Sequence, residues 1–237
     1  MDTDRVVLIT GATGEFGPYV ARAFCQTGAR LSLTARKLET AQALADDLGL
    51  EAAQALPHAV DLTQADSVTA WVEAVKDRWG RADVLVNLAG GYKPGKPVHE
   101  LDETDLDFML NINFRSTFLA CRAVVPLMLA QGSGKIINVG AKAGLAAGRR
   151  STAYAVSKAA VLRLTEALSA EVREQHINVN AVIPSTIDTP ANRDAQPNAD
   201  PAKWAKPEDL AAVITFLASD AASAIHGAAV PVYGPGG

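Results

Sequence analysis

The chain has 237 residues, of which 49% are apolar and 20% charged, and its net charge is −4. This composition is typical of one large α/β domain of a globular enzyme, and the lack of a basic stripe argues against nucleic-acid binding. The acidic start MDTDRVV shows no signal peptide, and no apolar run is expected to reach the length of a membrane span. Cys25 and Cys121 fall in apolar helical runs, as reduced core cysteines do, and the four histidines show no metal-ligand spacing. We therefore expect a cytoplasmic protein with no membrane or nucleic-acid partner and no metal.

The first twenty residues predict a strand, a glycine turn and a helix. An apolar strand at 5–10 is followed by Gly11, Gly14 and Gly17, and then by an amphipathic run. Glycines at this spacing let the backbone turn sharply and approach a pyrophosphate, and the helix N-terminus offers free N–H groups to it. A glycine triplet alone is a weak signal, but its place between a strand and a helix favours a bound dinucleotide.

Strands and helices alternate along the rest of the chain. We expect strands at 29–36, 55–62, 82–90, 134–140, 177–185 and 227–234, and helices at 38–49, 64–80, about 102–131, around Tyr154, and at 207–219. The rhythm predicts an α/β fold, with a doubly wound parallel sheet of about seven strands and helices on both faces. No linker or repeat divides residues 1–237, so we expect a single domain. The irregular segment at about 185–206 follows a strand's carboxyl end, where ligands bind in such sheets, and is a candidate substrate lid.

Tyr154 and Lys158 lie four residues apart in the run STAYAVSKAAV. That spacing is about one helical turn, so the phenol and the ammonium are expected on one helix face. A nearby ammonium favours the phenolate and lowers a pKa that starts near ~10, which makes the phenol a useful proton donor or acceptor. A lone pair of this kind is more often a solvated helix face, so its weight depends on the rest of the chain.

The end of the second predicted strand bears on the choice of cofactor. An NAD enzyme usually has a carboxylate there for the ribose 2′-OH, whereas this chain has Arg36 and Lys37. Arg binds phosphate through a planar fork, so we expect NADP to be preferred over NAD. Glu15 argues the other way, because a carboxylate near the phosphate turn repels an extra phosphate. Arg36 could instead stack on the adenine or start a solvated helix.

Together these features resemble the short-chain dehydrogenase/reductase family over essentially the whole chain. The resemblance rests on the turn at Thr10–Gly17, Asp61 after the third strand, NLAG at Asn87–Gly90, Asn113, Tyr154 with Lys158, and PSTIDTP at Pro184–Pro190. It implies a single-domain Rossmann fold, an NAD(P)-dependent oxidoreductase activity, a small-molecule substrate and a homodimer or homotetramer.

The resemblance also implies a role for individual residues. Tyr154 would exchange a proton with the substrate oxygen, Lys158 would lower the tyrosine pKa and bind the nicotinamide ribose, and Asn113 would hold a water in the proton relay. The implied cofactor-binding residues are Gly11, Thr13, Gly14, Phe16, Gly17, Arg36, Asp61, Leu62, Asn87, Ala89, Gly90, Tyr154, Lys158, Pro184, Ile187 and Thr189.

Two positions depart from the common family pattern. Position 15 is Glu, where short members usually have a glycine, and Ala141 stands thirteen residues before the tyrosine, where the family has a serine. That serine donates a hydrogen bond to the substrate oxygen, and losing one such donor costs roughly 2–4 kcal/mol of transition-state stabilisation. Lys142, Ser151 and Thr152 are candidate replacements, although the last two more simply cap the following helix.

The chain further resembles one branch of the family, the quinonoid dihydropteridine reductases. The shared features are the glycine spacing, AGG at 89–91, GAKA at 140–143 without a serine, and a lid that runs from DTP at 188–190 to Trp204. They imply hydride transfer to a quinonoid dihydropterin-like or small carbonyl substrate, with Tyr154 as proton donor. Asn113 departs from that branch. The alternatives are a 3-oxoacyl or carbonyl reductase with a substituted donor, and a dinucleotide-binding protein with little turnover.

Three residues are candidate substrate contacts. Ala141 occupies the donor position, Tyr92 follows the glycines after the fourth strand, and Trp204 lies in the lid. Arg193, also in the lid, either pairs with an anionic substrate group or forms a salt bridge within the lid.

Overall fold

The computed structural model describes residues 4–236 and centres on a seven-stranded sheet with the order β3-β2-β1-β4-β5-β6-β7. All neighbouring strands are parallel. The strands are β1 Val6–Thr10, β2 Arg30–Ala35, β3 Ala55–Ala59, β4 Val84–Asn87, β5 Gly134–Val139, β6 Ile177–Pro184 and β7 Ala229–Val232. The predicted doubly wound sheet is confirmed, although several strands are shorter than predicted. The strand order reverses between β1 and β4, and crevices at such a switch point bind ligands.

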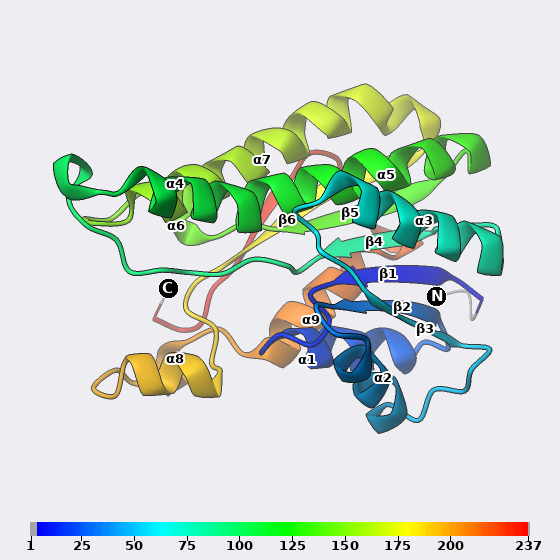
Figure 1. Ribbon diagram of the computed structural model, residues 1–237, viewed down its shortest axis with the longest axis horizontal. Coiled ribbons are helices and arrows are strands. Elements are labelled where there is room, and N and C mark those ends of the chain that lie inside the picture. The colour runs from blue at the N-terminus through cyan, green and yellow to red at the C-terminus, as the bar shows by residue number, and fades with distance from the viewer. Residues whose placement is uncertain (1–3, 237) are drawn as a thin grey trace.

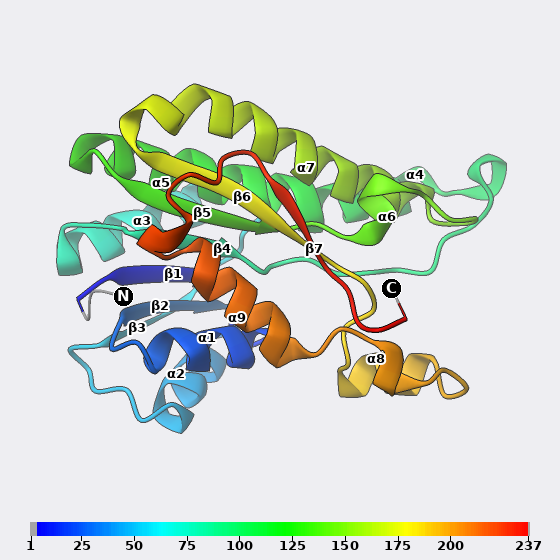
Figure 2. The same ribbon diagram turned by 180° about the vertical axis from the view of Figure 1, so that it is seen from behind.

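Helices cover both faces of the sheet (Figures 1 and 2). On one face lie α1 Gly17–Cys25, α2 Leu38–Asp47 and α9 Pro207–Leu217; on the other lie α3 Ala65–Trp79, α4 Glu103–Met109, α5 Ser116–Gln131 and α7 Thr152–Val172. The short helices are α6 Lys142–Leu145, α8 Pro190–Ala195 and the 3-10 turns η1 Val98–Glu100, η3 Arg173–Gln175, η4 Pro201–Lys203 and η5 Asp220–Ala222.

Alternation along β1 explains the two layers. Successive side chains of a strand point to opposite faces, so Val7 and Ile9 join the core beneath α1 and α9, while Val6 and Leu8 join the core beneath α3 and α5. All four side chains are fully buried. A continuous apolar strand is therefore what a sheet covered on both faces requires.

The helix predicted at about 102–131 is interrupted. Between α4 and α5 the chain forms a six-residue π-helix, Leu110–Arg115, labelled η2, which contains the fully buried Asn113. Single π-helical turns inside α-helices occur often at functional sites, because the extra residue re-aims the side chains around it.

The same helix corrects the expectation that no apolar run reaches membrane-spanning length. By length and composition, the helix Glu103–Gln131 is long and apolar enough to span a membrane, because its most apolar window has a mean hydropathy of 1.2. In the structure 44% of its most apolar window is buried inside the protein, and α5 packs against α3, α7 and the sheet. A buried core helix passes the same test, so the result is weak evidence for a membrane span.

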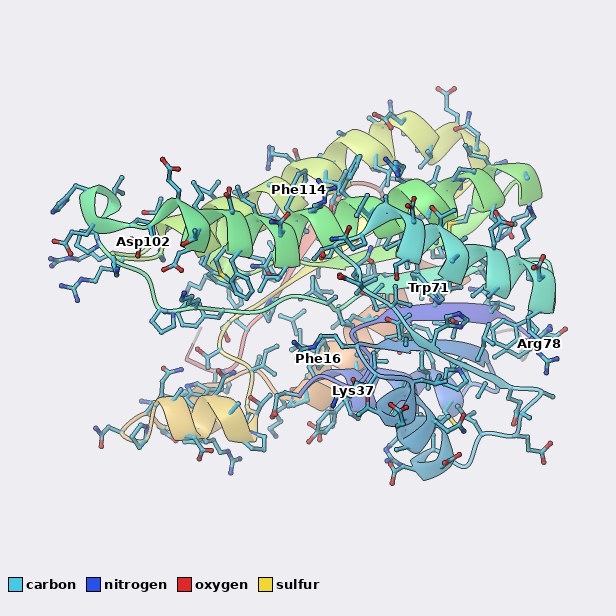
Figure 3. The ribbon with its side chains drawn as sticks, in the orientation of Figure 1. Phe16, Lys37, Trp71, Arg78, Asp102 and Phe114 are labelled. Carbon is cyan, nitrogen blue, oxygen red and sulfur yellow. The ribbon has the colours of Figure 1, made fainter. Side chains whose placement is uncertain are left out.

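Trp71 and Cys121 belong to the core, as predicted for the cysteine, whereas Cys25 is half-buried against the core. Trp71 is fully buried, and its indole Nε1 donates to Ser32 Oγ at 2.8 Å, so α3 is anchored to β2 (Figure 3). Cys25 and Cys121 are both free thiols. Burial raises the pKa of the Cys121 thiol to about 12, which keeps it protonated and unreactive.

Candidate active site

The glycine turn is held tightly between two strands. Gly11 has φ +64°, and a Cβ added there would lie 2.9 Å from Ala89 Cα; at Gly17 an added Cβ would lie 2.2 Å from the carbonyl oxygen of Ala12. Both positions therefore require glycine. Thr34 Oγ1 accepts from the Gly11 N–H at 3.3 Å and thereby ties the turn to β2. The N-cap residue of α1, Phe16, makes no side-chain cap hydrogen bond, which leaves the helix N-terminus suited to a phosphate.

A cavity of about 680 Å³ opens beside this turn, at the carboxyl ends of β1, β2 and β4. Its volume is within the usual range for small-molecule sites, about 300–1,000 Å³. The predicted cofactor-binding residues that line it are Gly11, Thr13, Gly14, Arg36, Asp61, Leu62, Ala89 and Gly90. Residues that fit a dinucleotide thus meet around one space, although their individual roles stay predictions.

The other predicted cofactor-binding residues lie outside this lining. Phe16 and Gly17 lead into α1, Pro184 ends β6, and Asn87 at the end of β4 donates to Asn138 Oδ1 at 2.9 Å. Ile187 and Thr189 lie in the predicted lid, where Thr189 is buried and caps α8 by accepting from the Asn192 N–H at 3.3 Å. In Figure 3, Phe16 and Lys37 mark the glycine turn and the β2–α2 junction, on the α1 and α2 side of the sheet.

Sequence reasoning missed several residues that line the cavity. Phe108, Ile112 and Ser116 enter it from the helix that spans α4, η2 and α5, Thr34 lies in β2, and Thr63 follows β3. The spacing of four between the first three would have placed them on one face of a helix. That signal was present, but without the fold nothing showed that this face meets the cofactor cavity.

Asp61 is fixed by its own turn. Its carboxylate accepts from Thr63 Oγ1 at 2.7 Å and from the Thr63 N–H at 2.9 Å, and these hydrogen bonds hold the pKa of Asp61 below its usual value. The ionised oxygens are therefore oriented at the cavity wall, as a contact to an adenine amino group needs.

Lys158 is buried, and its hydrogen-bond partner is a backbone carbonyl rather than the Tyr154 hydroxyl. The side chain is 6% exposed, and Nζ donates to the Val139 carbonyl oxygen at 2.9 Å. Burial lowers the pKa of Lys158 to about 8 and, together with the neighbouring Tyr92, raises the pKa of Tyr154 to about 12. The expected lowering of the tyrosine pKa is therefore wrong for this structure, because desolvation of the phenol dominates.

Asn113 joins the β4 loop to α7. Its Oδ1 accepts from the Gly91 N–H at 3.0 Å, and its Nδ2 donates to the Gly91 carbonyl at 3.1 Å and to Ser157 Oγ at 3.0 Å. Ser157, which sequence reasoning missed, donates in turn to the Tyr154 carbonyl at 2.7 Å. These contacts make Asn113 a positioning residue, and its predicted role in holding a water stays a prediction.

Gly90 connects the cofactor cavity with the Tyr154 helix. A Cβ added at Gly90 would lie 2.5 Å from Asn113 Oδ1 and 3.3 Å from Lys158 Nζ. Because Gly90 also lines the cavity, the Lys158 ammonium lies close to that part of the cavity wall. The fold thus brings Gly90 and Lys158, which lie 68 positions apart in the sequence, close together.

Tyr92 packs against Tyr154. Ala141, by contrast, has no side-chain hydrogen-bond donor. The two tyrosine rings meet edge to face, with centroids 5.1 Å apart and an interplanar angle of 86°, and Tyr92 is 63% exposed. Ala141 is buried before α6. Of the proposed replacements, Lys142 lies over the Tyr233 ring at 5.2 Å. Ser151 Oγ donates to the Gly148 carbonyl at 2.7 Å rather than capping α7, so the capping role expected for it is wrong.

The two ends of the segment predicted as a lid are joined by backbone pairing. Ile187 pairs with Ala205, whose carbonyl accepts from the Asp188 N–H at 2.9 Å. Between them α8 stands away from the sheet (Figures 1 and 2). Arg193 pairs with Asp188 at 2.6 Å and holds the pKa of that carboxyl below its usual value, so the structure shows the salt-bridge alternative. Trp204 is 8% exposed, and its substrate contact stays a prediction.

The chain shows its family when compared with known proteins. Residues 5–200 match the family model described as short chain dehydrogenase. The chain belongs to the short-chain dehydrogenase/reductase family. It is accordingly an NAD(P)-dependent oxidoreductase for carbonyl or alcohol substrates. Within residues 4–236, no group of three or more His, Cys, Asp or Glu side chains could hold a metal.

Relatives of this dehydrogenase/reductase cover almost its full length. D-threitol dehydrogenase of Mycolicibacterium smegmatis is 36% identical, over 97% of this chain and 92% of its own. The 3-oxoacyl-[acyl-carrier-protein] reductase of Thermotoga maritima is 33% identical, over 97% of this chain and 96% of its own. The NAD+-bound crystal structure of a xylitol dehydrogenase has a TM-score of 0.89 at 25% identity, over 99% of this chain and 100% of its own. The family resemblance is confirmed, and the nearer resemblance to quinonoid dihydropteridine reductases stays a prediction.

Proposed function

We propose that Tyr154 exchanges a proton with the oxygen of a small carbonyl or alcohol substrate at the Gly90 end of the cavity. The bound nicotinamide supplies or accepts the hydride. The observation that carries the proposal is Gly90 itself, which lines the cavity and whose added Cβ would lie 3.3 Å from Lys158 Nζ. That proximity supports a position for the buried ammonium, and with it the start of α7, beside the bound cofactor.

The pKa values favour the reduction direction near neutral pH. Because the pKa of Tyr154 is raised to about 12, its phenol is protonated at pH 7 and can donate to a developing alkoxide. In the oxidation direction the phenol must first lose that proton. We therefore propose that reduction of a carbonyl runs well at neutral pH and that alcohol oxidation requires alkaline pH.

We propose that Tyr92 supplies the donor that Ala141 lacks. Its ring already contacts the Tyr154 ring, and its exposed position leaves the hydroxyl accessible to a substrate. Tyr92→Phe keeps the ring contact and removes only the hydroxyl, so kcat should fall by roughly 10²-fold, as for loss of one oxyanion donor. The measurement is steady-state reduction with saturating cofactor. A kcat equal to wild type would assign the donor elsewhere, with Lys142→Met the next variant.

We propose that Arg36 selects NADP by binding the 2′-phosphate. Arg36 lines the cavity at the end of β2, and that strand end carries no carboxylate. Arg36→Ser should raise KM for NADPH roughly tenfold to a hundredfold, the value of one charge-assisted contact. KM for NADH should stay within about a factor of two, because NADH has no 2′-phosphate. Arg22→Ser, at an arginine that does not line the cavity, is the control. Equal effects of Arg36→Ser on both cofactors would exclude this role.

The candidate substrates fall into two groups. The Ser-less GAKA block and the lid favour a quinonoid dihydropterin, a polarised ring that accepts hydride with a tyrosine alone as proton donor. The named relatives favour a 3-oxoacyl thioester or a polyol. The test is NADPH and NADH oxidation with each acceptor, freshly generated dihydropterin included and its uncatalysed reaction subtracted, together with polyol oxidation.

Each outcome of that panel decides between the candidates. Clear turnover of dihydropterin supports the branch resemblance, and turnover of the thioester or polyol alone supports the general carbonyl reductase alternative. Cofactor binding without turnover of any acceptor would favour the dinucleotide-binding alternative and overturn the proton-transfer role of Tyr154.

We further propose a cytoplasmic homodimer or homotetramer. Exposed apolar side chains lie on the outer helices, with Phe118 and Leu129 on α5 and Val156 on α7. A second copy of the chain would bury such side chains, and most oligomers of identical chains pair the same surface around a two-fold axis. Light scattering on the purified protein measures the assembly, and a monomer at micromolar concentration would exclude it.

A further inference from the structure

A second cavity of about 360 Å³ lies at the amino ends of the strands, whereas the glycine turn lies at their carboxyl ends. Its lining comes from the amino ends of the strands: Arg5 directly precedes β1, Lys135 is the second residue of β5, and His176 directly precedes β6. At a rise of about 3.3 Å per residue, β5 separates this cavity from the carboxyl edge by roughly 15–20 Å. It is therefore distinct from the cofactor cavity.

The carboxylates in this cavity are already neutralised. Each lies in an ion pair with an arginine: Asp83 with Arg81 at 2.6 Å, Asp220 with Arg5 at 2.5 Å, and Asp4 with Arg30 at 2.6 Å. Among residues 4–236, no carboxylate lies within ion-pair distance of Lys135 or Arg173, which also line the cavity. The lining thus keeps two cations without a paired anion, beside the imidazoles of His176 and His226.

Lys135 is the most informative member of this set. It is 8% exposed, and its Nζ donates at 2.7 Å to Asn178 Oδ1, a neutral acceptor. Asn178 is fixed in turn, because its Nδ2 donates to the carbonyls of Ser223 at 2.8 Å and Ile225 at 2.9 Å. An ammonium has three N–H donors, and the hydrogen bond that the structure gives this one goes to a neutral amide, while the Asp220 carboxylate attracts it only from beyond ion-pair distance. Burying an ammonium without a directly bonded anion is costly. A bound anion would offset that cost.

We propose that this cavity binds a small oxyanion of the phosphate monoester class. Lys135 and Arg173 would hold the charged oxygens, and His176 and His226 would border them. A tetrahedral phosphate has three strong acceptor oxygens, which suits donors that converge from several strand ends. The cavity is larger than a bare phosphate and falls at the small end of the usual range for organic ligands, about 300–1,000 Å³.

The histidine side chains allow phosphate binding at this cavity to be followed by NMR. It has four histidines, of which His176 and His226 line this cavity, whereas His58 and His99 do not. Inorganic phosphate is titrated into the full-length protein at constant pH and ionic strength, with the imidazole resonances followed by NMR. We expect the resonances of His176 and His226 to shift saturably and the other two to stay in place. Assignments come from His176→Gln and His226→Gln.

Variants separate this site from the cofactor site. Arg173→Gln, on an exposed turn, should weaken phosphate binding at least roughly tenfold, as loss of one charge-assisted hydrogen bond does. Lys135→Met should weaken it more. Arg36→Ser, which alters only the proposed 2′-phosphate site, should leave the titration unchanged, as should saturation with NADPH. An acetate titration distinguishes a site for phosphates from one for any oxyanion.

Two results would overturn the proposal. One is a set of shifts that is linear in phosphate and equal across all four histidines, which indicates unspecific ionic effects. The other is a saturable shift that Arg173→Gln and Lys135→Met both leave unchanged. Neither result depends on the reductase activity, so failure here leaves the proposed function intact.

Discussion

Replacing Tyr154 with Phe should lower kcat/KM by roughly 10²–10⁴-fold, the usual contribution of a positioned proton donor. The change removes one oxygen and keeps the ring, so the edge-to-face contact with Tyr92 survives. Tyr154 is half-buried, and burial raises its pKa to about 12. Phenylalanine leaves no group at that position that can donate a proton in its place. Steady-state rates with the best acceptor of the panel measure the effect, and cofactor binding by fluorescence titration should change by less than about threefold.

The matched control for this variant is Tyr19→Phe. Tyr19 lies on α1 and is 39% exposed, so its hydroxyl should be dispensable. A Tyr154→Phe enzyme that keeps wild-type kcat/KM would refute the assigned proton transfer. A variant that loses cofactor binding as well would show a structural rather than a chemical defect, and thermal unfolding would confirm that reading.

The sequence predicted the fold almost completely because the sheet leaves a strong pattern. Strands buried on both faces read as apolar runs, and the glycines at 11 and 17 are required by backbone contacts that only glycine allows. The strand ends were less predictable, since pairing with neighbours rather than apolar character decides where a strand stops. β3 ends at Ala59, for example, although the apolar residues Val60 and Leu62 follow on either side of Asp61.

The π-helical turn at Leu110–Arg115 illustrates what the sequence could not show. Its residues have no local signal against a plain α-helix, and the turn fits the contacts of Asn113 with Gly91 and Ser157. Those partners lie 22 and 44 residues away, so only the tertiary structure brings them together.

The pKa of Tyr154 was mispredicted for a related reason. Spacing on a helix shows which side chains share a face, but it does not show how much water each retains. In the structure Lys158 turns to the Val139 carbonyl at the end of β5, and both side chains are largely desolvated. Burial then decides both pKa values, in opposite directions for an acid and a base.

Lys158→Met should change how stability depends on pH, in a direction fixed by that burial. The pKa of Lys158 is about 8 in the folded protein, against 10.5 for the ordinary side chain. Between these values the unfolded chain binds more protons than the folded one, so the stability of the wild type rises with pH. The variant lacks this contribution. The free energy of unfolding of the wild type minus that of Lys158→Met should therefore increase by about 3 kcal/mol from pH 7 to 10.5.

The sign of this difference does not depend on what else the substitution does. Removing the ammonium also leaves the Val139 carbonyl without its donor, which costs about 1–3 kcal/mol, but that cost is the same at every pH. Titration of Tyr154 and Cys121, whose folded pKa values are raised to about 12, lowers stability above pH 9 in both proteins and cancels in the difference. Urea unfolding without cofactor at several pH values gives the two curves, and the exposed Lys206→Met serves as control. Parallel curves for wild type and Lys158→Met would mean that the buried lysine keeps its ordinary pKa. Diverging curves would show that the fold holds this ammonium at a cost, as expected of a group kept for binding and proton transfer rather than for stability.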